Sequence, residues 1–487
     1  MRLFLRSSIR SFLLRRGFYL IFLLLPLART LPLRAQHLSY SASVGSFTTY
    51  FRIAGKCGQY LFIYKSRFGK DSLIGYTGDM QEAVRQPLKF LPQEVDELEF
   101  IAYPDHIFLY CVYRQRNELR CMTARLDSLG RLRGRPAIID RMPLREGLQV
   151  ARGIGGFRLI KSAGQERMMI LGIREPPDSP FCRIRTFLLG PASELLHRGA
   201  VVLPWQSAQD QLNSLLMADG TLLFVRGSQA VFDRGITRVM LFHKPPEVDL
   251  LYGMPCPLDG RAVSPSMMLK AGVRDGCFWW TAWAYNKSHR FIAGLYTCLY
   301  NYRTRRILIH RFSPLGTRLW REQKGRRHAA SIDFEACRFR DLIFDRGGHG
   351  ILFAEDAHVP GSRRAASGNM LLLKIDTTGS LNGYDIAERP ADMGLYYTSA
   401  AYLILNTGDA LHLLYNRIYS SGRLFGNVKR AIFDYRYDGV HPSGALPLRI
   451  VPDTDNWMLG LGRQTGPRTI IVPCERNGNL LFARLEF

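Results

Sequence analysis

Two short stretches of the chain, "RLDSLGRLRG" at 125–134 and "KIDTTGSLNG" at 374–383, share one frame. Each has a basic residue, an aliphatic residue, Asp, Ser or Thr, any residue, Gly, any residue, Leu, any residue and Gly. Gly supplies the left-handed backbone of a tight turn, and Asp accepts local hydrogen bonds from the turn. The frame therefore predicts one piece of architecture made twice, rather than a ligand site used twice.

The spacing of the copies predicts a longer repeat. Asp127 and Asp376 are 249 residues apart, and Ser313 holds the Asp position in a third stretch, "RFSPLGTRLW". A step of about 62 residues connects the three and reaches Asp438 in a further turn. Steps that land on 65, 189 and 251 also fall in expected turns, although the motif is missing there. The chain thus has the internal period of a repeat protein.

Most segments of the chain have the composition of short strands. Examples are "HIFLYCVY" (106–113), "CFWWTAWAY" (277–285) and "TIIVPCE" (469–475), which are aliphatic or aromatic and are bounded by turn residues. The best helix candidate is "MQEAVRQPLKFL" (80–91), and Pro87 interrupts it. This pattern indicates an all-β fold.

A unit of about 60 residues with four strands predicts the blade of a β-propeller. We expect residues 36–487 to form a single β-propeller of seven or eight four-stranded blades. The last unit, 457–487, has about three strands, and an N-terminal strand such as "HLSYSAS" (37–43) is expected to complete it and close the ring. The alternative is two or more separate β-sandwiches, but no linker divides the chain.

The frame of the turn resembles the blade turns of secreted bacterial β-propeller repeat proteins, including quinoprotein-like ones. "RFSPLGTRLW" (311–320) is the closest copy, because Trp320 stands where such repeats place a Trp. The stretch also resembles the Asp-box turn of sialidase-like propellers, with Leu315 in place of the Asp of that motif. Arg133 and Asn382 replace the Trp in the other copies. The resemblance implies a fold class and no single activity.

The N-terminal segment, 1–35, has the pattern of an export signal. Five arginines and no acid precede an apolar stretch at 17–28, which is too short to cross a bilayer. Cleavage is expected after Ala35, so the protein is expected to be exported to the periplasm, the cell surface or the medium. An uncleaved anchor and a mitochondrial presequence are the alternatives. No later stretch is long and apolar enough to span a membrane.

The composition is that of a globular and strongly basic protein. The hydrophobic share is 47%, and the formal net charge is +25. Removal of residues 1–35 takes away seven arginines and no acid, which leaves +18. Such a charge attracts polyanions. For an exported protein the expected partner is a protein or an acidic glycan, and no nucleic acid is expected.

The nine cysteines show no CxxC spacing, which argues against a zinc ribbon or a thioredoxin-type site. Cys111 and Cys121 flank an expected three-residue turn, Gln115-Arg116-Asn117. Such a turn would place the two cysteines opposite one another, within reach of a disulfide bond. We prefer the interpretation that they are two buried thiols.

The first candidate site is a basic and aromatic surface that could bind a polyanion. Its residues are Arg303, Arg305, Arg306, Arg311, Arg321 and Trp320. A second basic group comprises Arg114, Arg116, Arg120, Arg125, Arg131, Arg133 and Arg135. Guanidinium groups bind carboxylate, sulfate and phosphate with two parallel hydrogen bonds. The competing interpretation is a solvated blade edge, where charges prevent aggregation.

Three further groups are weighed as sites. An acidic stretch carries Asp341, Asp345, His349, Glu355, Asp356 and His358, but its spacing matches no metal-binding or catalytic motif. "DTDNW" (453–457) lacks the remaining ligands of a calcium loop. An aromatic strand carries Phe278 and Trp280 on one face, and Trp279, Trp283 and Tyr285 on the other. Packing between blades is the preferred role of these aromatics.

These observations favour an exported, non-catalytic β-propeller that binds a protein or an acidic glycan. No cofactor and no metal are expected, because the chain has no GxSxG, HExxH, P-loop or dinucleotide-binding motif. The alternative is a carbohydrate-active hydrolase or lyase, with carboxylates that converge at the centre of the ring. A quinone-dependent oxidoreductase is a third possibility.

Overall fold

The computed structural model shows an all-β protein. It describes residues 36–46, 50–144, 156–174, 180–204, 211–229, 235–288, 291–316, 334, 337–345, 347–356, 370–387, 402–419, 429–437, 442–448, 450–452 and 455–487. These residues form β-strands, their turns and a short 3-10 helix, η3 (Leu459–Leu461). The expected signal segment, 1–35, lies outside them. None of the helices described is long and apolar enough to cross a membrane.

Five sheets have four strands each, and the strands of each sheet are hydrogen-bonded in chain order. The first two of these sheets consist of β3 (Tyr50–Cys57), β4 (Tyr60–Arg67), β5 (Lys70–Tyr76) and β6 (Glu82–Pro87), and of β7 (Val95–Ala102), β8 (His106–Gln115), β9 (Glu118–Asp127) and β10 (Leu132–Pro143). The third consists of β11 (Gly156–Lys161), β12 (Met168–Arg174), β13 (Phe181–Leu189) and β14 (Leu195–Pro204). The last two consist of β23 (Cys337–Phe344), β24 (Gly350–Asp356), β25 (Met370–Ile375) and β26 (Leu381–Ala387), and of β27 (Tyr402–Asn406), β28 (Leu411–Tyr419), β29 (Lys429–Tyr437) and β30 (Pro442–Pro447). The best helix candidate, 80–91, contains strand β6 instead, and Pro87 ends that strand.

Two further sheets are larger. The eight-stranded sheet consists of β15 (Gln211–Leu216), β16 (Leu222–Gln229), β17 (Ile236–Lys244), β18 (Tyr252–Cys256), β19 (Val263–Ala271), β20 (Cys277–Tyr285), β21 (Ile292–Asn301) and β22 (Arg306–Pro314). A single residue pair, Ile236 with Val263, joins its β15–β18 half to its β19–β22 half. The six-stranded terminal sheet consists of β1 (His37–Tyr40), β2 (Gly45–Ser46), β31 (Asn456–Trp457), β32 (Arg463–Gly466), β33 (Thr469–Arg476) and β34 (Asn479–Glu486).

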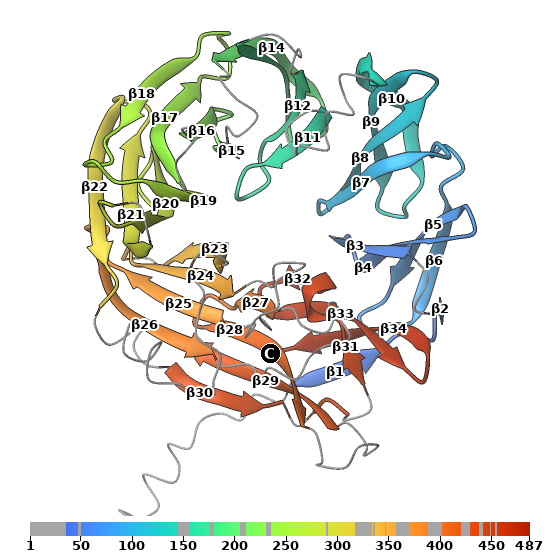
Figure 1. Cartoon of the computed structure of the whole chain (residues 1–487). Coiled ribbons are helices and arrows are strands. Elements are labelled where there is room, and N and C mark those ends of the chain that lie inside the picture. Colours follow the sequence, from blue (N-terminus) through green and yellow to red (C-terminus); the bar gives the residue numbers. More distant parts are fainter. Residues whose placement is uncertain are drawn as a thin grey trace, which may run out of the picture.

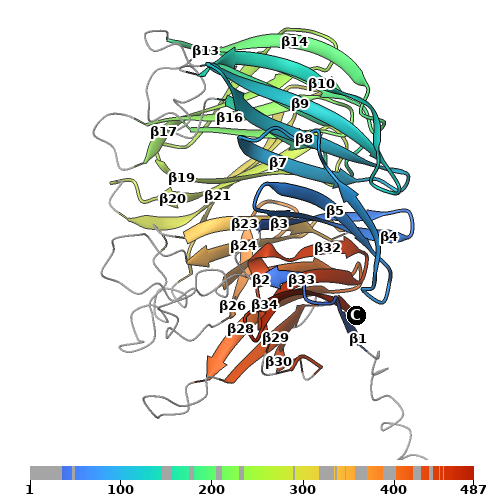
Figure 2. The same cartoon turned by 90° about the vertical axis from the view of Figure 1, so that its right-hand side faces the viewer.

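The sheets stand around a common axis as a β-propeller (Figure 1). Figure 2 shows the ring edge-on, with the strands crossing its thickness. The predicted fold class, an all-β propeller, is confirmed. The prediction of seven or eight four-stranded blades is wrong: five sheets have four strands, and the other two have eight and six. The others are larger because a backbone bridge joins β17 to β19 and because both ends of the chain enter one sheet.

The hydrophobic core lies in the seams between neighbouring sheets. Eight clusters of buried side chains each combine residues of two sheets, or of the two halves of the eight-stranded sheet. Strand β20 is buried along its whole length and supplies two seams. Trp279, Trp283 and Tyr285 pack toward the β23–β26 sheet, whereas Phe278 and Trp280 pack toward the β15–β18 half. The predicted inter-blade packing of these aromatics, with the predicted division between faces, is confirmed.

The repeated motif is a turn between the third and fourth strands of a sheet. The Asp127 carboxylate accepts hydrogen bonds from the backbone N–H groups of Leu129 and Arg131, both at 2.9 Å. Gly130 has a φ of 75°, in the left-handed region that glycine adopts without strain. Asp376 and Gly379 repeat this arrangement. The interpretation of the motif as turn architecture is confirmed.

The expected step of about 62 residues holds only in part. Turns with the same two backbone hydrogen bonds begin at Thr77, Asp127, Gly190, Met217, Asp345 and Asp376. Ser313 lies inside strand β22, so the third copy of the motif is not this turn. Residue 65 lies in β4, and Asp438 lies outside the described residues. The step fails because the sheets differ in length: the first two of these turns are 50 residues apart.

Cys111 and Cys121 lie on opposite faces of their sheet and are free thiols. The turn between β8 and β9 has two residues, with Gln115 paired to Glu118. That register pairs Cys111 with Met122 and Cys121 with Val112. Because a shift of one residue reverses the face of a strand, the expected three-residue turn and the disulfide reach were wrong, and the preferred buried thiols are confirmed.

Candidate functional site

The arginines predicted to form one polyanion-binding surface diverge from the β21–β22 turn. Arg303 forms ion pairs with Asp275 and Asp219, and its Nη2 lies 3.8 Å from Asp219 Oδ2. Arg306 is exposed at the start of β22. Arg311 donates a hydrogen bond from Nη1 to Thr378 Oγ1, at 3.4 Å, and so reaches the β23–β26 sheet. Trp320 and Arg321 lie outside the described residues.

Arg305 points to the other side of the same half-sheet. Its guanidinium carbon lies 3.7 Å from the centre of the Tyr252 ring, which belongs to β18. His243 stacks on the same Tyr252 ring, with centroids 5.0 Å apart. Burial, and then the charge of Arg305, lower the pKa of His243 to about 4. Arg305 and His243 thus both contact the Tyr252 ring, which belongs to the β15–β18 half of the eight-stranded sheet.

The acidic stretch is divided among separate pairs. Asp341 pairs with Lys270 at 2.7 Å, Glu355 pairs with Arg340, and Asp345 lies 3.3 Å from His349. The side chains of Asp356 and His358 lie outside the described part of the chain. Within that part, no group of three or more His, Cys, Asp or Glu residues could hold a metal ion. In the stretch at 453–457, Asp455 is buried and pairs with Arg476.

The second basic group is also partly neutralised. Arg114 pairs with Asp96 at 2.8 Å, Arg120 with Glu118 at 2.7 Å, and Arg125 with Asp105 at 3.4 Å. These pairs lie at exposed or half-exposed positions, where an ion pair contributes little to stability. The group therefore presents a mixed surface rather than a continuous basic one.

A hollow lies at the seam between the β19–β22 half and the β23–β26 sheet. It encloses about 440 Å³, including its open mouth. Its lining residues come from five segments of the two sheets: Val273, Arg274, Trp279, Leu299, Gly347, Gly348 and Thr377. We call it the seam hollow. Trp279 and Leu299 are 5% and 3% exposed and form an apolar floor that continues into the core of the seam.

Two turns of the repeated frame form one wall of the seam hollow. Asp345 accepts a hydrogen bond from the N–H of His349 at 2.9 Å, and Gly348 adopts a φ of 84°. Asp376 accepts the N–H groups of Thr378 and Ser380 at 2.8 and 2.9 Å. These fixed turns present the bare backbone of Gly347 and Gly348 and the exposed Thr377 to the hollow.

The opposite wall is the turn between β19 and β20, with Val273 and Arg274. Val273 is 56% exposed, and Arg274 is exposed beside it. Asp275, the acid next in the chain, is engaged by Arg303. The structure shows no ion pair between Arg274 and any of the residues it describes. The seam hollow thus combines an apolar floor, a hydroxyl group, backbone polar groups and an available guanidinium group.

Two carboxylates lie on a strand at the inner side of the ring. Glu97 and Glu99 are on β7, the end strand of its sheet, which Figure 1 shows on the side that faces the central opening. Lys161 of β11 forms an ion pair with Glu99. These residues are not among the candidates taken from the sequence.

The residues that give the seam hollow and the Glu97–Glu99 pair their chemistry were not predicted from the sequence. The Asp-Arg-Gly-Gly stretch at 345–348 shares the Asp-x-x-Gly frame, so the frame itself was a usable signal for that wall. Arg274 gave no signal, because its neighbours in the hollow come from another sheet. Glu97 and Glu99 alternate along a strand, which places both on one face, but nothing in the sequence identifies that face as central.

Comparison with known proteins yields similarity of fold only. No protein-family model and no curated protein matches the chain. A solved prolyl endopeptidase is 10% identical, with a TM-score of 0.41, over 88% of this chain and 55% of that one, so this chain spans about half of that protein. The WD40 domain of SCAP from fission yeast is 8% identical, with a TM-score of 0.42, over 93% and 98% of the two chains. An ulvan lyase, a polysaccharide lyase, is 9% identical, with a TM-score of 0.39, over 77% and 89%. These similarities are too distant to indicate an activity or a ligand.

Proposed function

We propose that the protein is a β-propeller that binds an acidic glycan in the seam hollow. The observation that carries the proposal is the position of Arg274, an exposed guanidinium group without an acid partner among the described residues, above a floor of Trp279 and Leu299. Arginine binds carboxylate and sulfate groups through charge-assisted hydrogen bonds. Apolar side chains favour the carbon-bearing face of a sugar ring, and Thr377 offers a hydroxyl group to its polar edge.

The surroundings of the seam hollow favour an extended, negatively charged ligand. Arg311 lies at the neighbouring turn, where it contacts Thr378, and the exposed Arg306 begins the same strand. We propose that these two arginines, with Arg321 and Trp320, contact further acidic sugars of the chain. Arg303 contributes less, because Asp275 and Asp219 already compensate its charge. The formal net charge, which is +18 after removal of residues 1–35, raises the local concentration of polyanions.

The test is a binding titration with oligogalacturonate, a carboxylated glycan, and with neutral dextran as the comparison. Arg274→Gln should weaken oligogalacturonate binding by at least about tenfold, because one charge-assisted hydrogen bond contributes about 1.5–3 kcal/mol. The matched control is Arg131→Gln, which removes the same charge from an exposed turn of another sheet. Equal losses in the two variants, or equal binding of dextran, would refute the proposal.

We further propose that the ring has eight blades and is closed by the N-terminal strand. The support is that the eight core clusters link every sheet or half-sheet to the next, and that one of them joins the terminal sheet to the β3–β6 sheet. Strand β1 pairs with β34 over four residue pairs, from His37 with Glu486 to Tyr40 with Ala483. In this scheme the two halves of the eight-stranded sheet count as two blades.

We also propose that residues 1–35 are removed during export, so that the propeller acts in the periplasm, at the cell surface or in the medium. The basic start and the short apolar stretch of this segment support the proposal. Mass spectrometry of the protein recovered from its native cells should give a chain that begins at Gln36. A chain that keeps residues 1–35 would contradict it.

A further inference from the structure

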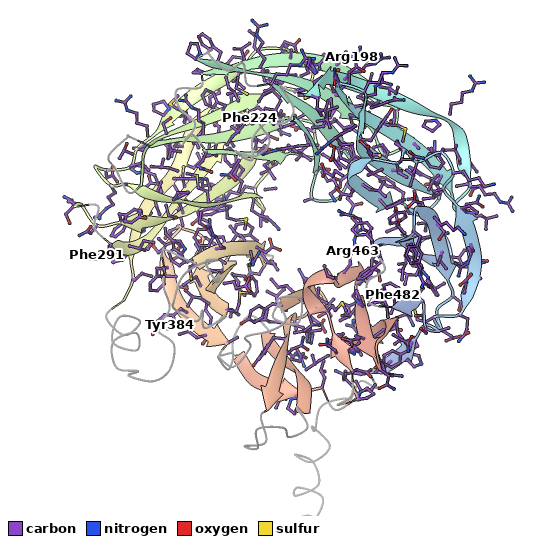
Figure 3. The ribbon with its side chains drawn as sticks, turned by 45° about the vertical axis from the view of Figure 1, so that its right-hand side comes forward. Arg198, Phe224, Phe291, Tyr384, Arg463 and Phe482 are labelled. Atoms are coloured by element: carbon purple, nitrogen blue, oxygen red, sulfur yellow. The ribbon has the colours of Figure 1, made fainter. Side chains whose placement is uncertain are left out.

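Exposed apolar side chains gather on one outer strand of the ring, β14, and on the segments beside it. The described residues expose fourteen large hydrophobic side chains, and six of them lie here: Phe181, Leu195, Leu196, Val202, Val248 and Leu250. We call this surface the β14 patch. Figure 1 shows β14 at the outer side of the ring, and Figure 3 shows Arg198 of the same strand at the outer edge. Exposed apolar side chains gathered in this way mark an interaction site.

The edge of β14 offers backbone hydrogen bonds to another strand. β14 is the end strand of its sheet, and among the described residues it pairs only with β13. Alternate residues of such a strand direct their N–H and C=O groups away from the sheet. β14 is ten residues long, its only formally charged residue is Arg198, and its one proline, Pro204, is its last residue.

Other outer strands carry the features that prevent pairing with a foreign strand, namely charges, prolines and bulges. β10 has four charged side chains, a proline at 136 and two register shifts in its pairing with β9. β6 has two charged side chains in six residues, and β30 both begins and ends with proline. β26 has one charge, is seven residues long and exposes no large apolar side chain. β14 has one register shift, near its start, and little other protection.

The β17–β18 turn lies against one face of β14. Asp249 of this turn is 3.7 Å from the Nε2 atom of His197, and a Cβ on Gly199 would overlap with the Asp249 carboxylate. Val248 and Leu250 flank Asp249 and are 40% and 59% exposed. A strand added to β14 would therefore direct alternate side chains toward an apolar turn.

Two arginines lie on the opposite face of β14 and β13. Arg183 of β13 pairs with Val202 of β14 and is exposed, as is Arg198. The guanidinium carbon of Arg198 lies 5.3 Å from the centre of the Phe187 ring, which shows that its stem lies along the sheet. The carboxylate that Arg198 reaches electrostatically, Asp140 on β10, forms an ion pair with Arg185 at 2.6 Å.

This face thus combines apolar and cationic groups. Arg198, Ala200 and Val202 alternate along β14 and project to the same side. Within the described part of the chain, neither Arg183 nor Arg198 forms an ion pair. The charge of the face therefore complements an acidic side chain next to apolar ones.

We infer that β14 is a docking site for an extended segment of another protein, which pairs with β14 as a fifth strand of its sheet. Backbone hydrogen bonds give such strand addition its affinity, and the alternate side chains give it specificity. The segment carries an acidic residue opposite Arg198 and apolar residues opposite Ala200 and Val202. A second copy of this chain fits less well, because two chains of net charge +18 after removal of residues 1–35 repel one another.

The test uses a short fluorescein-labelled peptide in which valine and threonine alternate and glutamate replaces the central valine. Fluorescence anisotropy measures its binding, and the same peptide with a central lysine is the comparison. We expect the glutamate peptide to bind at least about tenfold more tightly. Arg198→Glu should reverse this preference, because it reverses the charge opposite the central residue. Misfolding of the variant would abolish binding of both peptides and could not produce the reversal.

Two further measurements locate the peptide on the strand edge. Val202→Asp should weaken binding of the glutamate peptide at least about tenfold, because it replaces an apolar contact with a like charge. Leu308→Asp is the matched control, since Leu308 is 45% exposed on another outer strand, β22. With peptide at about ten times its Kd, the edge amides of β14 should exchange with deuterium about tenfold more slowly. A peptide that only adheres to the apolar surface would leave that exchange unchanged.

The outcomes decide between the alternatives. No binding at about 1 mM peptide, equal affinity for the two peptides, unchanged exchange in β14, or equal losses in Val202→Asp and Leu308→Asp would overturn the inference. Light scattering tests the other occupant: a dimer that Val202→Asp converts into a monomer would assign the edge to a second copy and would also overturn it. Arg274→Gln should leave peptide binding unchanged, because the seam hollow lies between other sheets. The inference therefore does not depend on the proposed function.

Discussion

The contact between the two ends of the chain gives a specific prediction about ring closure. Asp455 has a fully buried side chain that accepts hydrogen bonds from Arg476 Nε and Nη2, at 2.7 and 2.8 Å. Tyr40, on the N-terminal strand β1, donates a third hydrogen bond to Asp455 Oδ2 at 2.5 Å. The Arg476 guanidinium carbon also lies 4.3 Å from the centre of the Tyr40 ring. Tyr40→Phe removes the hydrogen bond and keeps the ring.

The expected cost follows from the charge of the acceptor. A hydrogen bond to a charged group contributes about 1.5–3 kcal/mol. We therefore expect Tyr40→Phe to destabilise the attachment of β1 by about 2 kcal/mol, which corresponds to about a thirtyfold increase in local opening. The assay is amide hydrogen exchange followed by mass spectrometry. Peptides from β1 and β34 should exchange about thirtyfold faster, because each opening exposes their shared backbone hydrogen bonds.

A matched substitution within one sheet controls for the loss of any Tyr–Asp hydrogen bond. Tyr64 on β4 donates a 2.5 Å hydrogen bond to Asp71 on β5. Tyr64→Phe should speed exchange in those two strands and leave β1 unchanged. If Tyr40→Phe changes exchange in β1 by less than about twofold, or speeds exchange equally throughout the chain, β1 does not close the ring in the way described.

Two further predictions concern stability, and a third concerns the thiol groups. The pKa of His243 is lowered to about 4 in the folded state, whereas an unfolded histidine takes up its proton near pH 6.5. The unfolded state thus binds more protons between these values, and stability should fall by about 3 kcal/mol as the pH is lowered through this window. Urea unfolding at a series of pH values measures the fall, and His243→Phe should flatten that part of the profile; an unchanged slope would show that His243 is not its source. Gly379→Ala should cost about 2–3 kcal/mol, because φ is 79° and a Cβ would lie 2.8 Å from Thr297 Oγ1. Gly408→Ala is its control, with a φ of 86° and open space, and should cost about 1 kcal/mol in the same unfolding assay; equal costs would exclude the contact with Thr297 as the cause. Cys111 and Cys121 should both react with a thiol reagent after denaturation without reductant, and a missing pair of thiols would mean that they are bridged.

The features that the sequence predicted correctly depend on short-range patterns. Strand β20 alternates its aromatics along nine residues, and alternation alone assigns Trp279 and Trp283 to one seam and Phe278 and Trp280 to the other. The Asp-x-x-Gly frame predicted its turn, because the Asp127 carboxylate and the left-handed Gly130 act within five residues. Such features need no knowledge of which sheets are neighbours.

The features that were missed depend on the backbone conformation of single turn residues and on which sheets are neighbours. The turn after β8 has two residues because Arg116 adopts a left-handed φ of 56°, which a non-glycine residue seldom does. That difference of one residue reversed the expected position of Cys121 relative to Cys111. The seam hollow joins Arg274 to Thr377, which are more than 100 residues apart, and an ion pair joins Glu99 of β7 to Lys161 of β11. No single stretch of sequence contains either pair.

The most direct test of the central claim, that the seam hollow binds an acidic glycan, is a crystal structure of the protein with oligogalacturonate. The account predicts a carboxylate of the sugar within about 2.7–3.1 Å of the Arg274 guanidinium nitrogens, with the ring above Trp279 and Leu299. A sugar bound at another place while the seam hollow stays empty would contradict it.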